Sequence, residues 1–235
     1  MISQFRFNNL KSYDDFGLTL IDVVVSYPSV NVVSVSVPFM SGSYDFSSLY
    51  GGQTYSNRTV KLKLAIEDMP DNTRTRLNIL YDQVVQWLYT SQISDLKIDY
   101  VEHTFTGRVI EISDREEFVN TESIEVTFDC HPFRKSDLEE GHDMWDDFNF
   151  ETDVAQDVSF DVIGSKEITI INAGSTAITP IIATNASFDV TLDGIVYKFP
   201  LGISKDYRFR LETGENKILL NGTGNIVFKF RKEVI

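Results

Sequence analysis

The sequence predicts a mainly β protein with two domains and one α-helix, on the basis of three observations. Apolar residues alternate with polar ones along several segments, which is the period of a strand with one buried face. Glycine, asparagine and aspartate cluster between those segments, where turns are expected. One segment in the first half shows a helical spacing of apolar residues. With 235 residues, the chain can form two cores of ordinary size.

The stretch from Val32 to Ile66 predicts a strand, a long excursion and a second strand. Val33, Val35 and Val37 alternate with serines, and the residues from Val60 to Ile66 alternate in the same way, so both strands are expected to be half-buried. The excursion between them contains more apolar surface than a solvated hairpin needs. These side chains either fold back over the protein's own core or bury against another molecule.

One helix is expected from about Asn72 to Tyr89. Pro70 suits a position near its start, and Asp71 or Asn72 can cap its first free amides. Five apolar residues recur at spacings of three, four, three and one, which places them on one stripe that packs on the sheet: Leu77, Leu80, Val84, Trp87 and Leu88. Further strands are expected in this half at residues 2–7, 17–25, 96–100, 105–112 and 123–130.

The second half predicts a β-sandwich. Short strands are expected at residues 168–171, 180–184, 187–192, 195–199, 207–211, 217–220 and 225–231. Asp193-Gly194 between two of them predicts a tight hairpin, and residues 221–224 predict another turn. We place the domains at residues 1–134 and 135–235, joined by an acidic connection at about 135–150. Trp145, Phe148 and Phe150 interrupt that acidic stretch and are expected to dock on the second domain.

Composition argues against several kinds of binding partner. The net charge of −14 disfavours tight association with nucleic acid or anionic membranes. No segment approaches the roughly 20 apolar residues of a membrane helix, and the first residues lack the architecture of a signal peptide. We therefore expect a protein that does not bind membranes.

The motifs point to no catalytic or metal chemistry. Three histidines occur in unrelated contexts, and Cys130 lies in an alternating run, where it is expected to be a small buried residue. Asp143, Asp146 and Asp147 lack the spacing of a calcium-binding loop. We expect no catalytic residues, no cofactor and no metal, and we therefore expect that the protein is not an enzyme.

Two segments of the first half resemble the distal tail (Dit) proteins of long non-contractile-tailed phages that infect Gram-positive bacteria. The first runs from Val37-Pro38 through a glycine and a Tyr/Asp segment to Tyr-Ser-Asn-Arg at residues 55–58, which leads an alternating strand. The second, Phe-Asp-Cys-His-Pro-Phe-Arg at residues 128–134, is similar to the aromatic-X-Cys-X-Pro-aromatic segment that ends the first domain in that family. The order of strands and helix is also similar.

The second half carries the same resemblance. Asn-Ala-Gly at residues 172–174, Thr-Pro-Ile-Ile at 179–182 and Thr-Gly-Glu-Asn-Lys-Ile at 213–218 resemble the galectin-like second domain of these proteins. The resemblance covers nearly the whole chain. It implies a β-sandwich-like first domain with one helix and a projecting excursion, followed by a galectin-like β-sandwich.

The resemblance also implies a function, that of a structural hub in the phage virion. The first domain would form a homohexameric ring at the distal end of the tail tube, with a central channel through which DNA passes. One face would meet the tail tube and tape-measure proteins, and the other a tail-associated lysin or fibre and the receptor-binding protein. The chain would be made in the cytoplasm of the bacterial host. The expected partner interface lies in the excursion and consists of Phe39, Met40, Tyr44, Phe46, Tyr50 and Tyr55.

The alternative is a carbohydrate-binding module that contacts the host cell wall. Such a module needs aromatic platforms on a surface, which Trp145, Tyr197, Phe199 and Tyr207 could supply if they are exposed. The second domain of the family resembles galectins in fold without obvious retention of a sugar site, and a fold alone does not carry a function.

Overall fold

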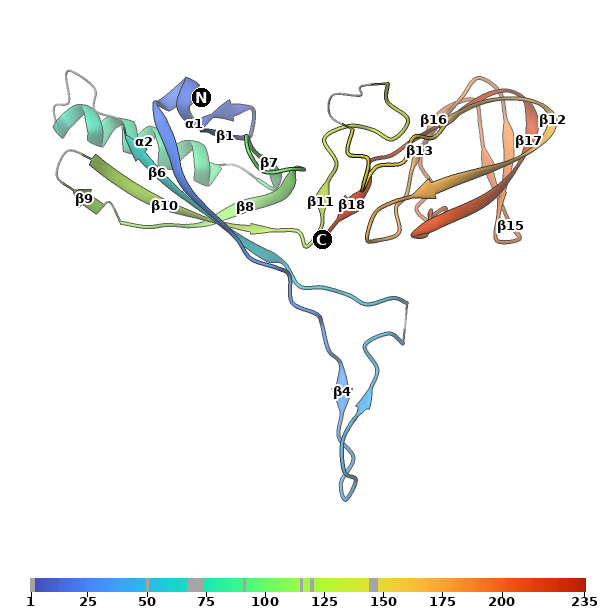
Figure 1. The fold of residues 1–235 in the computed structure, drawn as a ribbon, viewed down its shortest axis with the longest axis horizontal. Helices are drawn as coiled ribbons and strands as arrows, with labels where there is room; N and C mark the ends of the chain where they lie inside the picture. Colours follow the sequence, from blue (N-terminus) through green and yellow to red (C-terminus); the bar gives the residue numbers. More distant parts are fainter. Residues whose placement is uncertain are drawn as a thin grey trace. The chain divides into compact units, whose positions relative to one another are not determined.

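The computed structural model describes residues 3–49, 51–66, 74–90, 92–114, 116–118, 121–143 and 148–235. The chain divides into two compact units, Met1–Arg134 with Ile235, and Lys135–Val234. Both units are built mainly from strands (Figure 1), so the predicted fold class is confirmed. No helix among the described residues is long and apolar enough to cross a membrane.

The first unit is built on one antiparallel sheet of eight strands. Along its main path the strands follow the order β2-β1-β7-β8-β10-β6-β3, and β9 pairs with β10. Their bounds are β1 (Phe5–Phe7), β2 (Leu10–Lys11), β3 (Leu18–Val25), β6 (Arg58–Ile66), β7 (Ser94–Ile98), β8 (Phe105–Ile112), β9 (Glu116–Phe118) and β10 (Thr121–Cys130). The strands predicted at residues 17–25, 105–112 and 123–130 are confirmed within one or two residues.

Helix α2 (Arg74–Thr90) covers the core face of this sheet. The predicted stripe is confirmed: Val84, Trp87 and Leu88 are buried, whereas most residues of the opposite face are exposed. The Trp87 ring stacks on Phe5 at 5.5 Å between ring centroids and on Phe16 at 4.7 Å. The residues predicted to start the helix, Pro70 to Asn72, lie outside the described part of the chain.

A short helix that the pattern did not predict, α1 (Ser12–Phe16), lies between β2 and β3. Five residues are too few to show a helical period, so the sequence indicated only a turn at Asp14 and Asp15. The Asp15 carboxylate accepts a hydrogen bond from the backbone N–H of Lys11 at 2.7 Å. Gly17 ends the helix in the left-handed conformation, with φ of 69°.

The second unit is a β-sandwich built around two long strands. Its strands are β12 (Ser159–Asn172), β13 (Ile181–Thr184), β14 (Phe188–Leu192), β15 (Ile195–Phe199), β16 (Gly202–Ser204) and β17 (Gly214–Lys229), in the order β15-β14-β17-β13-β16 with β12 also paired to β17. A separate two-stranded ladder joins β11 (Arg134–Lys135) to β18 (Glu233–Val234). The first half of β17 pairs with β14 and the second half with β13, and both halves bury their inward side chains in one cluster.

The hairpin predicted at Asp193-Gly194 is confirmed. Both residues have positive φ values, 49° and 79°, as a two-residue type I′ turn requires. The turn predicted at residues 221–224 is wrong, because these residues continue β17. Gly222 and Gly224 instead let two side chains approach the backbone of β17 closely. A Cβ on Gly222 would lie 2.7 Å from the Phe188 ring, and one on Gly224 would lie 2.3 Å from the Asn185 side chain.

The strand predicted at residues 207–211 is also wrong. The Asp206 carboxylate accepts a hydrogen bond from the Arg208 N–H at 2.9 Å, and the Asp206 carbonyl accepts one from the Phe209 N–H at 3.1 Å. Together these bonds bend the chain into a turn. Leu211 alone forms an isolated bridge, to Ile178.

The acidic stretch is held against the second unit at several points. The Ser136 and Glu140 N–H groups donate to the carbonyls of Lys232 and Phe230, both at 2.9 Å. Lys232 has only 2% of its surface exposed, and its ammonium group forms an ion pair with Asp153. Trp145 lies outside the described residues, and Phe148 and Phe150 meet edge-on at 5.1 Å between their centroids.

Candidate assembly interface

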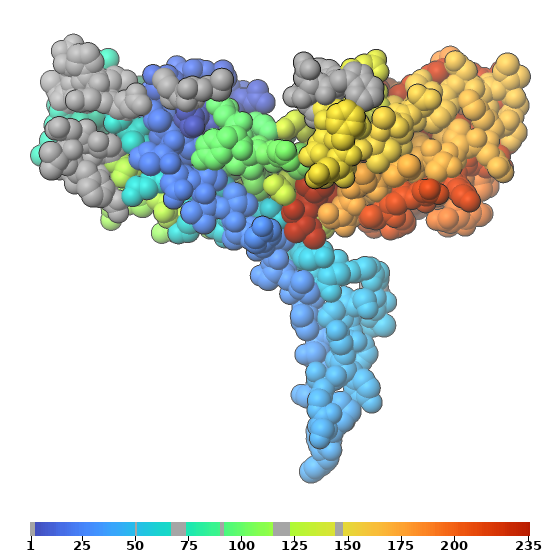
Figure 2. Space-filling model, viewed as in Figure 1, coloured from blue at the N-terminus to red at the C-terminus, as the bar shows by residue number. Residues whose placement is uncertain are grey.

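Residues 26–49 and 51–57 form a long two-stranded hairpin, which we call the arm. It continues β3 and β6 and projects beyond the sheet that these strands leave (Figure 1). The ladder begins with the Ser26 N–H donating to the Thr59 carbonyl at 2.9 Å, includes a bridge between Val30 and Tyr55, and reaches β4 (Ser34–Val35) and β5 (Tyr44–Asp45). In the space-filling view the arm is a thin projection, drawn in blue and cyan (Figure 2).

The arm has one apolar and one polar face. Because Val35 pairs with Tyr44 and side chains alternate along a strand, Val33, Val35, Val37, Tyr44 and Phe46 share one face, which we call the apolar face. All five are exposed, from 41% for Phe46 to 56% for Tyr44. Ser34 and Asp45 pair on the opposite face. The prediction that the valine strand is half-buried is therefore wrong, because its valines are exposed.

The apolar side chains of the excursion do not fold back over the protein's own core. The core of the first unit includes none of the described residues of the arm. A two-stranded hairpin alone is marginally stable in water, and an exposed apolar face of this kind usually marks a site of interaction. Of the two alternatives that the sequence left open, the structure therefore favours burial against another molecule.

The predicted interface residues lie at different places along the arm. Phe39 is fully exposed at the tip and has a positive φ of 67°, while Met40 beside it is half-buried. Tyr44 and Phe46 lie on the apolar face, with 6.4 Å between their ring centroids. Tyr50 lies outside the described residues. Tyr55 is half-buried at the base of the arm, where its ring meets Phe133.

The base of the arm contains a residue that our reading of the sequence missed, Arg58. It is the first residue of β6 and has only 2% of its surface exposed. Arg58 has the same spacing of two as the inward-facing residues of β6, which are Val60, Leu62, Leu64 and Ile66. The alternation therefore predicts that the Arg58 side chain also points inward. That alternation is the signal that could have identified it, because an arginine is almost never fully buried unless it is paired.

The guanidinium of Arg58 lies across the end of the sheet. Its Cζ atom is 5.9 Å from the centroid of the Phe105 ring, a cation–π distance. Arg58 pairs with Cys130 on β10, which pairs in turn with Gly107 on β8. A Cβ on Gly107 would lie 2.7 Å from the Cys130 sulfur, so glycine lets Cys130 pack closely against β8. Within the described residues, the Nε and Nη2 atoms of Arg58 are buried and have no hydrogen-bond partner.

Cys130 is not a reactive thiol. It is completely buried, and burial raises its pKa to about 12, with a further contribution from the neighbouring Asp129. A thiol with such a pKa is neutral at physiological pH, so it is neither a nucleophile nor a counter-ion for Arg58. Among the described residues, no group of three or more His, Cys, Asp or Glu side chains is arranged to hold a metal ion.

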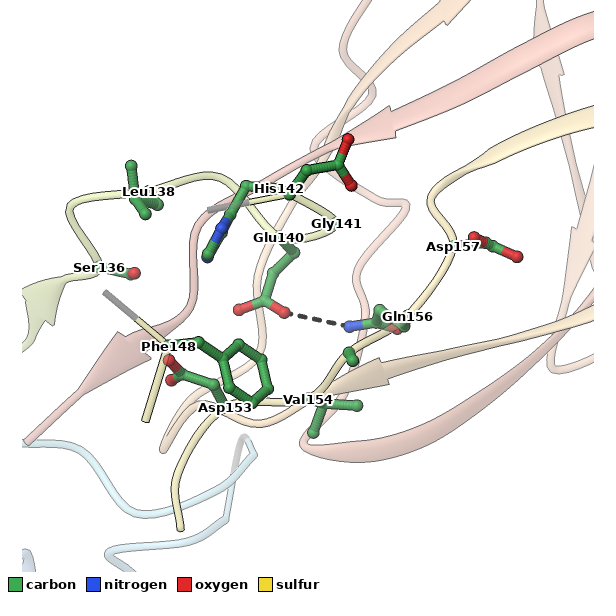
Figure 3. Close-up of a pocket in the computed structure, with 12 residues that line it drawn as sticks. Ser136, Leu138, Glu140, Gly141, His142, Phe148, Asp153, Val154, Gln156 and Asp157 are labelled. Atoms are coloured by element: carbon green, nitrogen blue, oxygen red, sulfur yellow. Dashed lines mark hydrogen bonds between the residues drawn. The ribbon is translucent and has the colours of Figure 1, made fainter. Parts of the chain in front are cut away.

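The second unit contains a pocket of about 320 Å³ beside the acidic stretch (Figure 3). Glu140, His142, Phe148, Asp153 and Gln156 are among the residues that line it. The Gln156 amide donates to the Glu140 carboxylate at 3.2 Å and to the Ile171 carbonyl at 2.7 Å, and it accepts from the Ile171 N–H at 2.8 Å. Glu140, Asp153 and Gln156 are thus engaged in contacts that hold this segment to the unit.

The aromatic residues proposed for sugar binding do not form a surface platform. Tyr197 and Phe199 are buried in the core of the second unit, and the Tyr197 hydroxyl donates to the Arg208 carbonyl at 3.1 Å. Tyr207 is exposed, with the Lys205 ammonium 5.3 Å from its ring centroid. Trp145 lies outside the described residues.

Comparison with known proteins identifies the fold. No protein-family model and no curated protein sequence matches the chain. The crystal structure of SPP1 Dit, described as a paradigm of the hub adsorption apparatus in phages that infect Gram-positive bacteria, matches with a TM-score of 0.69 and 14% identity, over 98% of this chain and 99% of that one. The chain therefore has the fold of SPP1 Dit, and the resemblance seen in the sequence is confirmed at the level of fold.

Two structures of a phage baseplate match more weakly. The phage p2 baseplate in its activated conformation with Sr has a TM-score of 0.46 at 9% identity, over 99% of this chain and 98% of that one. The same baseplate with Ca has a TM-score of 0.44 at 9% identity, over 100% of this chain and 99% of that one.

Proposed function

We propose that this chain is the structural hub of a phage tail tip. Six copies form a ring at the distal end of the tail tube, and a central channel through the ring lets DNA pass. The tail tube and tape-measure proteins meet one face of the ring. A tail-associated lysin or fibre and the receptor-binding protein dock on the other, so the protein is part of the virion and acts by binding rather than by catalysis.

The exposed apolar face of the arm carries this proposal. Valines and aromatic rings line that face and contact no core of their own unit. Burying one large apolar side chain contributes about 1.5–3 kcal/mol, so leaving five of them in water is costly unless a partner covers them. A ring of identical copies supplies that partner, because each copy presents a different patch to each of its two neighbours.

Fold and charge support the same proposal. SPP1 Dit, whose fold this chain shares over nearly its whole length, is itself a hub protein of a phage adsorption apparatus. A net charge of −14 suits a channel through which DNA slides, because a basic lining would bind phosphates through the release of counterions. The carbohydrate-binding alternative loses support, since two of its four aromatic residues are buried in the core.

Electron microscopy of the purified protein in negative stain tests this function. We expect rings with six-fold symmetry and a central hole. Tyr207→Ser, which removes an exposed aromatic ring from the second unit, is the matched control and should leave the rings intact. Single subunits, or closed dimers without a central hole, would contradict the proposal.

A further inference from the structure

Among the described residues of its own protomer, Arg58 forms no ion pair with an acidic side chain. Its Nε and Nη2 atoms are buried without hydrogen-bond partners among the described residues. Taking an ionised group out of water costs several kcal/mol unless it is paired and hydrogen-bonded. A guanidinium stays charged under all ordinary conditions, so it does not escape this cost by losing its proton.

The described neighbours of Arg58 do not balance its charge. Cys130 is a neutral thiol. Arg134 carries the same charge as Arg58. Its Nη2 donates to a main-chain oxygen of Ile235 at 2.8 Å, and its Nε is buried without a partner among the described residues. Asp129 points to the other face of the strand, where it accepts a hydrogen bond from Asn57 at 2.9 Å. Burial and the nearby Arg134 both lower the pKa of Arg58, as expected for a cation that lacks an anion. Among the described residues, no acidic side chain thus pairs with either arginine.

The arm carries one charged residue along its whole length, Asp45. Its Oδ1 atom accepts hydrogen bonds from the N–H and the hydroxyl of Ser47, and these bonds lower the pKa of the carboxyl group. Ser47 therefore fixes the orientation of the carboxylate and keeps it ionised. Both of these bonds go to Oδ1, so Oδ2 is presented on the exposed polar face of the arm.

Asp45 does not reach Arg58 within one molecule. The ladder runs from Ser26, beside Thr59, to Ser34, which pairs with Asp45. Eight residues at about 3.3 Å each separate the two ends by about 26 Å. Asp45 and Arg58 can therefore pair only if they belong to two different molecules.

We propose that Asp45 on the arm of one copy pairs with Arg58 and Arg134 at the arm base of a second copy. This inference rests on the proposed function, because it names a contact that joins neighbouring copies of the ring. The contact is head-to-tail, so each copy gives one carboxylate and receives another. Repetition of such a contact forms a ring when the rotation between neighbouring copies closes. At the arm base, Arg134 is half-buried and Tyr27 is exposed, so the site borders the protein surface.

A double-mutant cycle on the self-association of the full chain tests the pair. The variants are Asp45→Asn, Arg58→Met and the two combined, and the measurement is the dissociation constant from sedimentation over a concentration series. Asn keeps an acceptor for the Ser47 N–H, and Met is about as long as the arginine stem, so neither disturbs the arm or the core. Asp193→Asn and Arg208→Met remove exposed charges from the second unit and serve as matched controls.

Each single variant should weaken association at least about tenfold, since removing one partner of a buried charge pair is costly. The double variant should be no weaker than the worse single variant, because the second change removes nothing further. The controls should associate like the wild type. Single variants that associate normally, or effects that multiply in the double variant, would overturn the pair while leaving the ring intact. A wild-type chain that stays monomeric at every concentration would overturn the ring itself.

The melting temperature of the dissociated protein separates assembly from folding. Arg58→Met should melt at the same temperature as the wild type or higher, because it removes an unpaired buried charge. A clearly lower melting temperature would mean that Arg58 is satisfied within its own protomer, and the proposed pair would be wrong. Asp45→Asn changes only an exposed residue of the arm, so its effect on association is measured on an intact fold.

Discussion

The ring of Tyr55 meets the ring of Phe133 edge-on, with 5.7 Å between their centroids and an angle of 82° between their planes. Tyr55 lies at the base of the arm, and Phe133 follows the end of β10. This contact joins the arm to the body of the first unit, so Tyr55 serves as an anchor. Phe39, Tyr44 and Phe46, further along the arm, have no such contact with the core. The residues that the sequence grouped as one interface therefore divide into an anchor and an exposed set.

Changing Phe39, Tyr44 and Phe46 together to Ser should abolish assembly without destabilising the fold. These side chains are largely exposed in the protomer, so their loss should change the melting temperature of the dissociated protein by no more than about 2 °C. Assembly depends on burying them and should disappear. Differential scanning calorimetry and light scattering on the same samples measure both effects.

Tyr55→Ser is the matched comparison for that variant. It removes a half-buried ring and its edge-on contact, so it should lower the melting temperature more than the triple variant does. If the triple variant instead melts far below the wild type, the exposed rings belong to the protomer's own core, and the arm is not an interface.

The elements of the first unit were largely predictable because their apolar residues recur with the period of a strand or of a helix. The alternation in β6 and β10 and the helical stripe of Val84, Trp87 and Leu88 each indicated the correct element and the correct buried face. The arm was predicted only in part. Val33, Val35 and Val37 show the same alternation as a core strand. The alternation shows that one face is apolar, but it does not show whether that face packs against the same protomer or against another molecule.

The remaining errors arise where side chains or long-range contacts override local signals. Gly222 and Gly224 resemble a turn in the sequence, but they are needed because Phe188 and Asn185 pack against the backbone of β17. Asp206 bends the following residues by hydrogen bonding within a segment that has the composition of a strand. Arg58 was overlooked because the alternation around it directs attention to the apolar residues.

The thiol of Cys130 should not react in the folded protein. Its complete burial and its pKa of about 12 leave no accessible thiolate at pH 8. Ellman's reagent should detect no thiol in the native chain and one thiol after unfolding in guanidinium chloride. Ser41→Cys, on the exposed arm, is the control and should react at once with one equivalent. Rapid reaction of the unmodified chain would show that the end of the sheet around Arg58 is open.

Asp153→Asn should destabilise the second unit by about 3 kcal/mol at pH 7, because it leaves the buried ammonium of Lys232 without its anion. Burial alone would raise the pKa of Asp153, but hydrogen bonds from Lys232 and Asn149 outweigh it, and the pKa is lowered. The carboxylate therefore stabilises the fold above the ordinary pKa of an aspartate, and this contribution is lost as the pH falls through the lowered value.

Denaturant unfolding of this variant and the wild type at several pH values measures that dependence. The difference between the two proteins should be largest near pH 7 and shrink in acid. Asp189→Asn removes an exposed carboxylate that pairs with Lys198 and should have little effect. A difference that does not change with pH would show that the ion pair is not its cause.

Glu140→Gln should have the opposite effect on stability. Burial raises the pKa of Glu140, although the hydrogen bond from Gln156 partly opposes the shift. Between the ordinary pKa of a glutamate and the raised value, the unfolded chain loses the proton and the folded chain keeps it, so stability falls as the pH rises. The variant should raise the melting temperature at pH 7 by on the order of 2 °C and change nothing at pH 4. Equal effects at both pH values would contradict this reasoning.

The mass of the full chain in solution tests the proposed ring most directly. Multi-angle light scattering over a concentration series compares that mass with the 26.8 kDa of one chain. If the arm joins neighbouring copies, the mass should rise with concentration to a plateau at six chains, and the variant with Phe39, Tyr44 and Phe46 changed to Ser should stay at one. A wild-type mass of 26.8 kDa at every concentration would contradict the ring.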